Sequence, residues 1–406
     1  MCRPRKRKKR ILFVDSDAFV LSALRRSLRC RDMEWQLAFA ASVDSALAAM
    51  EANPAQVLVS GITLPGEGGI AFLEAIERNH PATARVILSG VCMYDEVARA
   101  QRVAHLYVTK PWSKNQLTQI VRSALALHDL LCLSGLPGAL TRVAVSEAQW
   151  PEWPRQHAAI VERMHSANGI TVRELASMIE QNPDMAQRLL NIVNSGLLGA
   201  TPLRGKLEHA IRVFGINALS SLVLAMEIFA ATGNADEERH ALLSAALAAS
   251  MAGRDAAEYA FTAALLHDVG LLYWPDHEPE CTTGDGAIGH AELGAYLLAT
   301  WGMPAPVIEA MAHHHHPMRN LDAERAQERD CAMVARAAVH VADGLANENR
   351  GRSPVIEQAA VDTLQFGGDL SSWRELTADL GARYDAKNSK NSRHSGSNSR
   401  RVTRPK

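Results

Sequence analysis

The 406-residue chain lacks a cysteine framework and a long uninterrupted apolar run. Its six cysteines are scattered and form no Cys-x-x-Cys pair, which is typical of a reducing compartment and gives no disulfide scaffold or zinc ribbon. The apolar run Ile11–Val14 ends at Asp15 and is too short for a signal-peptide core. Leu219–Ala231 is interrupted by Glu227 and is too short for a membrane span. We therefore expect a cytoplasmic protein with no membrane span.

Acidic residues are missing from both ends of the chain. Residues 1–10 and 386–406 each hold seven lysines and arginines and no acid. Removing these fourteen positive charges from the net charge of −1 leaves −15 for the residues between them. Such ends are typical of solvated, disordered tails. Weak binding to nucleic acid or anionic lipid is the alternative, but no aromatic residue interleaves with the basic ones, so base stacking is not indicated.

Short apolar runs alternate with helical patterns over residues 11–127. The runs are Ile11–Val14, Val57–Val59, Val86–Leu88 and Leu106–Val108. The helical patterns include Ala18–Leu28, Ile70–Arg78 and Asn115–Leu127. The alternation predicts an α/β fold, a doubly wound parallel sheet of the flavodoxin-like kind with helices on both faces. In such sheets functional groups gather at the carboxyl ends of the strands.

Beyond about Leu130 the strand pattern ends, and alanine- and leucine-rich stretches with helical spacing predict an all-α region. The expected helices are Val172–Glu180, Asp184–Val193, Leu207–Ala231, Arg239–Ala252, Tyr259–Leu266, His290–Thr300, Pro306–Ala312 and Arg329–Leu345. Gly135 and Pro137 mark a joint between the two regions. The predicted division is a basic tail over 1–10, an α/β domain over 11–127, a linker over 128–135, a helical domain over 136–345, a helical extension over 346–385 and a disordered basic tail over 386–406.

Polar and turn-forming residues follow four of the expected strands in a definite order. They are Val14-Asp15-Ser16-Asp17, Leu64-Pro65-Gly66, Ser89-Gly90 and Tyr107-Val108-Thr109-Lys110-Pro111. On these motifs, residues 11–127 resemble the receiver domain of a two-component response regulator. The resemblance implies carboxylates that hold Mg²⁺, one of which accepts a phosphoryl group. It also implies a hydroxyl, a lysine and an aromatic residue that respond to the new phosphoryl oxygens.

Two of the carboxylates that the resemblance implies are missing. The matching residues that remain are Asp15, Asp17, Ser89, Tyr107 and Lys110. The second member of the acidic pair falls on Ser16, and the phosphoryl acceptor falls on Gly61, which has no side chain to modify. Asp17 would replace the lost acid only if its side chain turned into the same pocket.

We therefore expect a receiver that is not phosphorylated on aspartate and binds Mg²⁺ poorly. We also expect Lys110 to have lost the aspartate with which it would pair. The alternative role for Ser89, Tyr107 and Lys110 is to support the sheet edge, or a partner interface that needs no phosphate.

A second set of motifs spans about Leu136 to Asp343. It comprises Leu136-Pro137, Leu175–Pro183, Arg188–Ser195, Ala210–Gly215, Ala264–Gly270, Gly289–Gly294 and His313–Pro317. On these residues the region resembles the HDOD domain, a signalling relative of the HD phosphohydrolases. The active enzymes of that group bind a divalent metal through a histidine, a His-Asp doublet and a later aspartate, and the bound metal activates water against a phosphorus ester.

The resemblance carries candidate metal ligands over to this chain. The four that match by order and helical placement are His240, His267, Asp268 and Asp343, and the candidates for further ligands are His290, His314 and His315. Imidazole with carboxylate suits Fe, Mn or Zn rather than Mg alone. Leu271 stands where the active cyclic-dinucleotide enzymes have lysine, and no Gly-Tyr-Pro follows the histidine run. The alternative is a purely structural role, in which these histidines only form hydrogen bonds in a helix bundle or lie at exposed helix ends.

Two functions of different classes follow from these resemblances. The first is a two-component-type signalling regulator whose receiver and HDOD output domain act through protein–protein contacts rather than turnover. Its expected partners are other signalling proteins or a second copy of the chain. The second is a metal-dependent HD-type phosphohydrolase acting on a nucleotide or cyclic dinucleotide. The incomplete motifs favour the first, and the sequence names neither the upstream partner nor the downstream target.

Overall fold

The structure is a computed structural model. It describes residues 8–28, 35–65, 68–89, 103–133, 136, 159–160, 163–164, 169–194, 207–272, 288–319, 330–364 and 368–398. The chain forms two compact units. The first contains residues 1–153, 161–170 and 270–312, and the second contains 154–160, 171–269 and 313–406. The region expected as one helical domain over 136–345 therefore contributes to both units.

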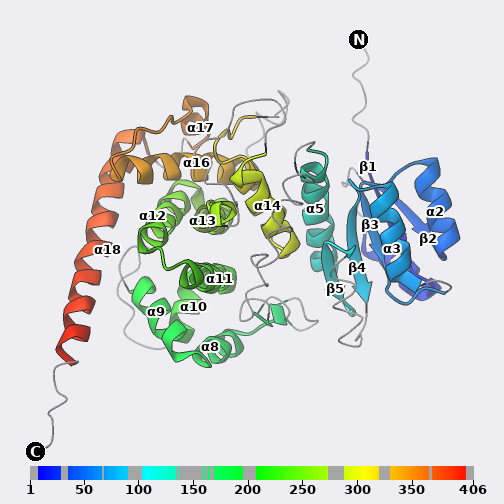
Figure 1. Cartoon of the computed structure of the whole chain (residues 1–406), viewed down its shortest axis with the longest axis horizontal. Helices are drawn as coiled ribbons and strands as arrows, with labels where there is room; N and C mark the ends of the chain where they lie inside the picture. The colour runs from blue at the N-terminus through cyan, green and yellow to red at the C-terminus, as the bar shows by residue number, and fades with distance from the viewer. Residues whose placement is uncertain are drawn as a thin grey trace, which may run out of the picture. The chain divides into compact units, whose positions relative to one another are not determined.

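The first unit is built on a parallel sheet of five strands in the order β2-β1-β3-β4-β5 (Figure 1). The strands are β1 (Lys9–Val14), β2 (Trp35–Ala40), β3 (Val57–Ser60), β4 (Ala84–Ser89) and β5 (Leu106–Thr109). The helices that alternate with them are α1 (Ala18–Ser27), α2 (Val43–Ala52), α3 (Gly68–Asn79) and α5 (Lys114–Leu131). The doubly wound α/β prediction is confirmed.

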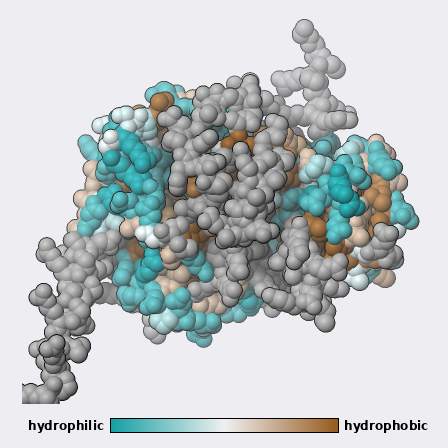
Figure 2. Space-filling view, viewed as in Figure 1, coloured by the Kyte–Doolittle hydropathy of each residue, from teal (hydrophilic) through white to brown (hydrophobic). Residues whose placement is uncertain are grey.

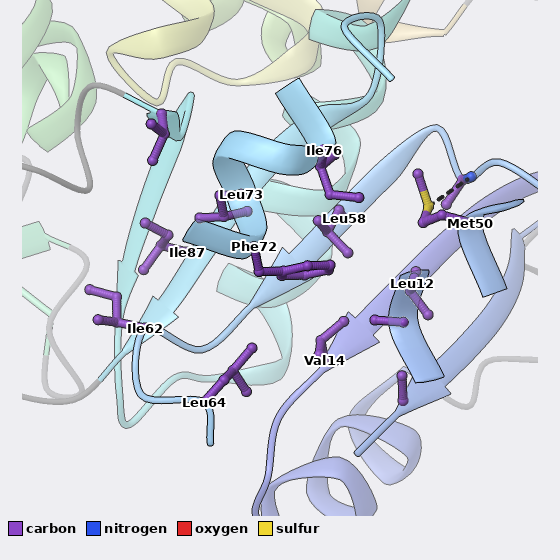
Figure 3. Close-up of a cluster of buried hydrophobic side chains, with 14 residues drawn as sticks. Leu12, Val14, Met50, Leu58, Ile62, Leu64, Phe72, Leu73, Ile76 and Ile87 are labelled. Atoms are coloured by element: carbon purple, nitrogen blue, oxygen red, sulfur yellow. Dashed lines mark hydrogen bonds between the residues drawn. The ribbon is translucent and has the colours of Figure 1, made fainter. Parts of the chain in front are cut away.

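A buried apolar cluster holds one side of the sheet in place (Figure 3). Leu12 and Val14 of β1 and Leu58 of β3 pack with Phe72 and Ile76 of α3. Val14 ends β1 directly before Asp15, and Leu58 lies in β3, three residues before Gly61. Burying each such side chain stabilises the fold by about 1.5–3 kcal/mol, so this core fixes the positions of these two strands.

Three details differ from the expected boundaries. Strand β2 was not expected, because polar Gln36 interrupts Trp35–Ala40 and leaves only the short run Leu37–Ala40. Strand β1 begins inside the predicted basic tail, where the Arg10 guanidinium donates to the Ala49 carbonyl. Helix α5 continues to Leu131, four residues past the expected end of the domain, because no glycine or proline stops it before then.

Two more helices belong to the first unit, α14 (His290–Thr300) and α15 (Ala305–Ala312), and both pack against α5. The Ser123 hydroxyl of α5 donates to the Met303 carbonyl, 2.9 Å away, in the turn between them. The ring of His105, at the start of β5, meets the edge of Tyr296 on α14, with 6.3 Å between the ring centroids. A late segment of the chain is thus part of the α/β unit.

The second unit is helical, as expected. Its helices are α8 (Val172–Glu180), α9 (Pro183–Val193), α10 (Leu207–Phe214), α11 (Ile216–Thr232), α12 (Ala235–Met251), α13 (Gly253–Leu266), α16 (Cys331–Asn349), α17 (Gln358–Thr363) and α18 (Leu370–Asn398). One continuous helix over Leu207–Ala231 was expected and is wrong. Gly215, at φ +88°, separates α10 from α11, because that backbone conformation ends a right-handed helix.

The prediction of a disordered tail from residue 386 is also wrong in part. Helix α18 runs to Asn398, since no proline interrupts residues 370–398. Two ion pairs, Arg239 with Asp385 and Arg374 with Glu348, join α18 to α12 and α16. Residues 1–7 and 399–406, the outer parts of both predicted tails, lie outside the described residues.

No single helix among the described residues is long and apolar enough to cross a membrane. The pair α10 and α11, bent by 114°, passes a test of length and composition only. Most apolar side chains of α11 are buried, which is typical of a core helix. The face shown in Figure 2 carries hydrophilic residues interspersed with smaller hydrophobic areas.

Candidate functional site

The receiver pocket lies at the carboxyl ends of β1, β3 and β5. A Cβ atom added to Gly61, which directly follows β3, would lie 3.4 Å from Oδ2 of Asp15. The missing side chain of residue 61 would therefore point at the remaining acid of the pocket. Gly61 has no positive φ and its backbone N–H donates to the Val14 carbonyl, so the backbone does not require glycine here.

Lys110 has a carboxylate partner, and the expectation that it had lost one is wrong. Its Nζ lies 2.6 Å from Oδ2 of Asp15, whose side chain is only 9% exposed. The lysine therefore pairs with the first acid of the pocket. The ammonium group that would read a phosphoryl oxygen is already neutralised inside the protein.

Asp17 does not replace the lost acid. Its carboxylate accepts from the Phe19 backbone N–H at 2.7 Å and caps the first turn of α1. Its own N–H donates to Oδ1 of Asp15. Ser89 and Tyr107 lie on the neighbouring strands β4 and β5, but their side chains lie outside the described residues. Of the predicted pocket residues, Asp15 and Lys110 therefore form an ion pair, whereas the Asp17 side chain caps α1 and is not part of the pocket.

A second cluster of polar side chains lies in the helical unit and draws on three helices. His240 stands on the second turn of α12, His267 and Asp268 follow the end of α13, and Asp343 lies on α16. These helices pack against one another, so positions separated by as many as 103 residues meet. The fold brings together the four candidate ligands that were matched by order and helical placement.

The spacing within this cluster is that of groups sharing one ion. Nε2 of His240 lies 3.2 Å from Nε2 of His267 and 3.0 Å from Oδ1 of Asp343. Nε2 of His267 lies 3.1 Å from Oδ2 of Asp268 and 3.3 Å from Oδ1 of Asp343. Zn–N and Zn–O bonds are about 2.0–2.2 Å long, which separates neighbouring ligand atoms by about 3–3.5 Å.

The tautomer of His267 also favours an ion at the centre of the cluster. Its Nδ1 lies 2.7 Å from the Ala264 carbonyl, and a carbonyl only accepts, so Nδ1 carries the hydrogen. In the neutral ring, Nε2 then presents a lone pair toward two carboxylate oxygens. That arrangement is repulsive unless a proton or a metal ion lies between them. The donor set of two imidazoles and two carboxylates therefore fits a divalent metal such as Fe, Mn or Zn.

The pKa values respond to the same electrostatics. Burial lowers the pKa of His267, but the charges and hydrogen bonds of Asp268 and Asp343 outweigh it and hold that pKa well above its ordinary value. Burial raises the pKa of Asp343, but hydrogen bonds from His240 and His267 hold it well below its ordinary value. The cluster thus attracts positive charge to its centre.

Residues that sequence reasoning did not single out contact or adjoin the cluster. Asn347 donates to Oδ1 of Asp343 at 2.7 Å, from one helical turn away. The three residues before His240 each form an ion pair: Glu237 with Arg350, Glu238 with Arg188, and Arg239 with Asp385. The i,i+4 spacing of Asp343 and Asn347 is a signal that the sequence does contain. The ion pairs join distant segments and leave no such signal.

The remaining candidate histidines come from two segments, the start of α14 and the residues shortly after α15. His290 begins α14 in the first unit, whereas His314 and His315 belong to the second. His314 is fully buried, not at an exposed helix end, and its ring meets the edge of the His267 ring at 5.3 Å between centroids. Its carbonyl accepts from Nδ1 of His340 at 2.7 Å, which fixes the turn after α15.

Comparison with known proteins accounts for both regions. The sequence model of the response regulator receiver domain matches residues 11–122, that of the HDOD domain matches 151–283, and that of the HD domain matches 238–348. The chain carries a receiver domain followed by HDOD and HD domains. The HD match contains His240, His267, Asp268 and Asp343, the residues of the cluster.

Individual relatives cover parts of the chain. The hydrogenase transcriptional regulatory protein HoxA of Bradyrhizobium diazoefficiens is 28% identical over 122 residues, which are 30% of this chain and 24% of that protein. An uncharacterized protein of Treponema pallidum is 24% identical over 183 residues, which are 38% of this chain and 36% of that protein. The chain thus spans about a quarter and about a third of these curated relatives.

Among solved structures, the receiver domain of an HD domain-containing protein from Pseudomonas fluorescens Pf-5 is 27% identical. The match covers 32% of this chain and 94% of that one, with a TM-score of 0.29. The three family models together, receiver, HDOD and HD, are those of a response-regulator-like signalling protein.

Proposed function

We propose that this protein is a signalling regulator whose receiver works without aspartyl phosphorylation. The observation that carries the proposal is that position 61 points at Asp15, lacks a side chain, and leaves Asp15 to pair with Lys110. The pocket therefore has neither an acceptor nor an unpaired lysine to respond to one. Its partners would be other signalling proteins in the cytoplasm.

The packing of α5 gives such a receiver a way to act on the rest of the chain. Helices α14 and α15 come from the stretch that the HD model matches, yet they pack on α5. Directly after α15 the chain enters the histidine run that contains the buried His314. A change at the receiver that moves α5 would therefore be passed along α15 by packing and by covalent connection.

Phosphoryl transfer to the purified full chain tests the proposal. With radiolabelled acetyl phosphate and Mg²⁺, the wild type should acquire no label on residues 11–127. Gly61→Asp is the informative variant, because its carboxylate would lie beside Asp15, and Gly61→Asn is its uncharged control. Acyl-phosphate label on a wild-type residue in this range would overturn the proposal, whether or not the variant is labelled.

The assembled cluster favours a second candidate, a metal-dependent phosphohydrolase. His240, His267, Asp268 and Asp343 would hold a divalent ion, which when bound lowers the pKa of a water ligand and makes it a nucleophile near neutral pH. Asn347 would keep Asp343 oriented, and Ala264 would keep the His267 tautomer fixed. A nucleotide or cyclic dinucleotide is the proposed substrate class.

Metal analysis separates the two candidates. Stoichiometric Fe, Mn or Zn in the wild type, lost in the His267→Ala, Asp268→Ala double variant, would support a metal centre. Hydrolysis of nucleotides or cyclic dinucleotides that disappears in the same variant would support the enzyme. Protein that binds no metal and hydrolyses neither class would remove the second candidate and leave the first.

A further inference from the structure

Helix α12 contains two buried polar atoms without a hydrogen-bond partner. One is Nδ1 of His240, and the other is Oγ of Ser244. His240 is 2% exposed and Ser244 is fully buried, so bulk water does not reach either of them. A buried polar group left unpaired costs about 1–3 kcal/mol. Two such groups on one helix therefore need an explanation.

Their spacing places them together. Ser244 follows His240 by four residues, so both side chains lie on the same face of α12. Each Cα–Cβ bond in a helix tilts toward the N-terminus, which directs the Ser244 side chain toward the turn of His240. Rotation about one bond of Ser244 changes where its hydroxyl points.

The hydroxyl of Ser244 also differs from three other helical hydroxyls among the described residues. Ser250 on the same helix donates to the Leu247 carbonyl at 2.7 Å. Ser221 and Thr377 donate to the carbonyls four residues before them. Such bonds to the preceding turn are the usual way in which a helical hydroxyl is satisfied. Ser244 makes none, so its oxygen is available to another group.

The two imidazoles of the cluster differ in the hydrogen bonding of their Nδ1 atoms. His267 donates its Nδ1–H to the Ala264 carbonyl, which in the neutral ring leaves the lone pair of Nε2 facing the carboxylates. His240 points its Nε2 at the same centre, but its Nδ1 meets no acceptor. Metal-binding histidines almost always donate their second ring N–H to a fixed acceptor. His240 lacks that acceptor, and Ser244 is an acceptor that lacks a donor.

We infer that Ser244 is the positioning residue of His240. Its Oγ accepts the Nδ1–H of His240, directly or through one ordered water, and so holds Nε2 unprotonated toward Asp343 and His267. The inference rests on the proposed metal centre. Ser244 touches neither the metal nor a substrate and acts only through the orientation and tautomer of His240.

Zinc affinity of the full chain tests the inference, measured by competition with a chelator of known affinity. Ser244→Ala should weaken Zn²⁺ binding about 10–100-fold, the usual effect of removing such a group. Ser250→Ala is the matched control and should bind as the wild type does, since its hydroxyl serves only its own helix. Ser244→Thr retains the hydroxyl and should restore most of the affinity.

A second readout distinguishes positioning from general stability. In the Zn²⁺-loaded wild type, ring ¹⁵N signals of His240 should show hydrogen on Nδ1 only, and Ser244→Ala should lose that uniform tautomer. Equal Zn²⁺ affinity and the same tautomer in wild type and Ser244→Ala would overturn the inference while leaving the metal centre intact. A wild type that binds no Zn²⁺ would overturn the metal centre and the inference with it.

Discussion

Ser123 should determine how firmly the turn between α14 and α15 is held on the receiver. Its hydroxyl donates to the Met303 carbonyl at 2.9 Å, and Ser123 is only 2% exposed. Replacing it by alanine removes the donor and leaves a carbonyl oxygen at a buried contact without a partner. An unpaired buried group of this kind costs about 1–3 kcal/mol.

That energy converts directly into a rate of amide exchange. Since about 1.4 kcal/mol corresponds to a factor of ten, Ser123→Ala should raise the local opening equilibrium roughly 5- to 150-fold. The faster exchange should appear in the amides of α14 and α15. Strands β1 and β3 should be unaffected, because no side chain of their core cluster is altered.

Hydrogen exchange followed by mass spectrometry on the full chain measures this effect. Thr118→Ala is the matched control: its hydroxyl is also on α5 but donates to the Lys114 carbonyl of the same helix. The control should leave α14 and α15 as protected as in the wild type. If Ser123→Ala gives the same exchange in α14 and α15 as Thr118→Ala, the proposed coupling through α5 is wrong.

Three further predictions concern single residues. Asp17→Ala should lower the free energy of unfolding by about 1 kcal/mol, the value of a helix cap, and an unchanged urea midpoint would contradict the capping role. His105 should lower the stability of the folded protein in acid, because burial, and then the charge of Arg85, lower its pKa well below the ordinary value. The unfolded chain therefore binds the proton more readily, and the free energy of unfolding falls by up to about 1.4 kcal/mol per pH unit below about pH 6.5. His105→Gln should flatten this dependence of stability on pH, measured by urea unfolding at several pH values. An unchanged slope would argue against the role of His105. Gly270→Ala should cost about 1–3 kcal/mol or more, because its new methyl group would collide with the His290 backbone carbonyl, and a thermal midpoint equal to that of the wild type would refute the close approach.

Much of the fold can be predicted from local patterns of apolar residues in the sequence. The continuous apolar runs of β1, β3, β4 and β5 identified their strands, because strands buried on both faces exclude polar residues. Strand β2 is mostly only part-buried and lacks that signature. The break at Gly215 was missed because one glycine is compatible with a helix until its φ is known.

The residues of the candidate sites could be predicted from the sequence, but the contacts between their side chains could not. The ligand types of the helical cluster are recognisable from motif order, and the fold places Asp268 and Asp343 each within 3.0–3.8 Å of His240 and His267. The pairing of Lys110 with Asp15 depends on an ion-pair distance between residues 95 apart, which no local pattern encodes. Ser244 is likewise unremarkable in the sequence and becomes informative only through its missing hydrogen bond.

The central claim is that the receiver influences the helical region without phosphoryl chemistry. Hydrogen exchange of the wild-type full chain, with and without acetyl phosphate and Mg²⁺, tests it most directly. The account predicts identical protection of α5, α14 and α15 in both samples, because Gly61 offers no acceptor and Lys110 is already paired with Asp15. A change in protection of α14 or α15 on adding acetyl phosphate, accompanied by covalent phosphoryl label, would contradict it.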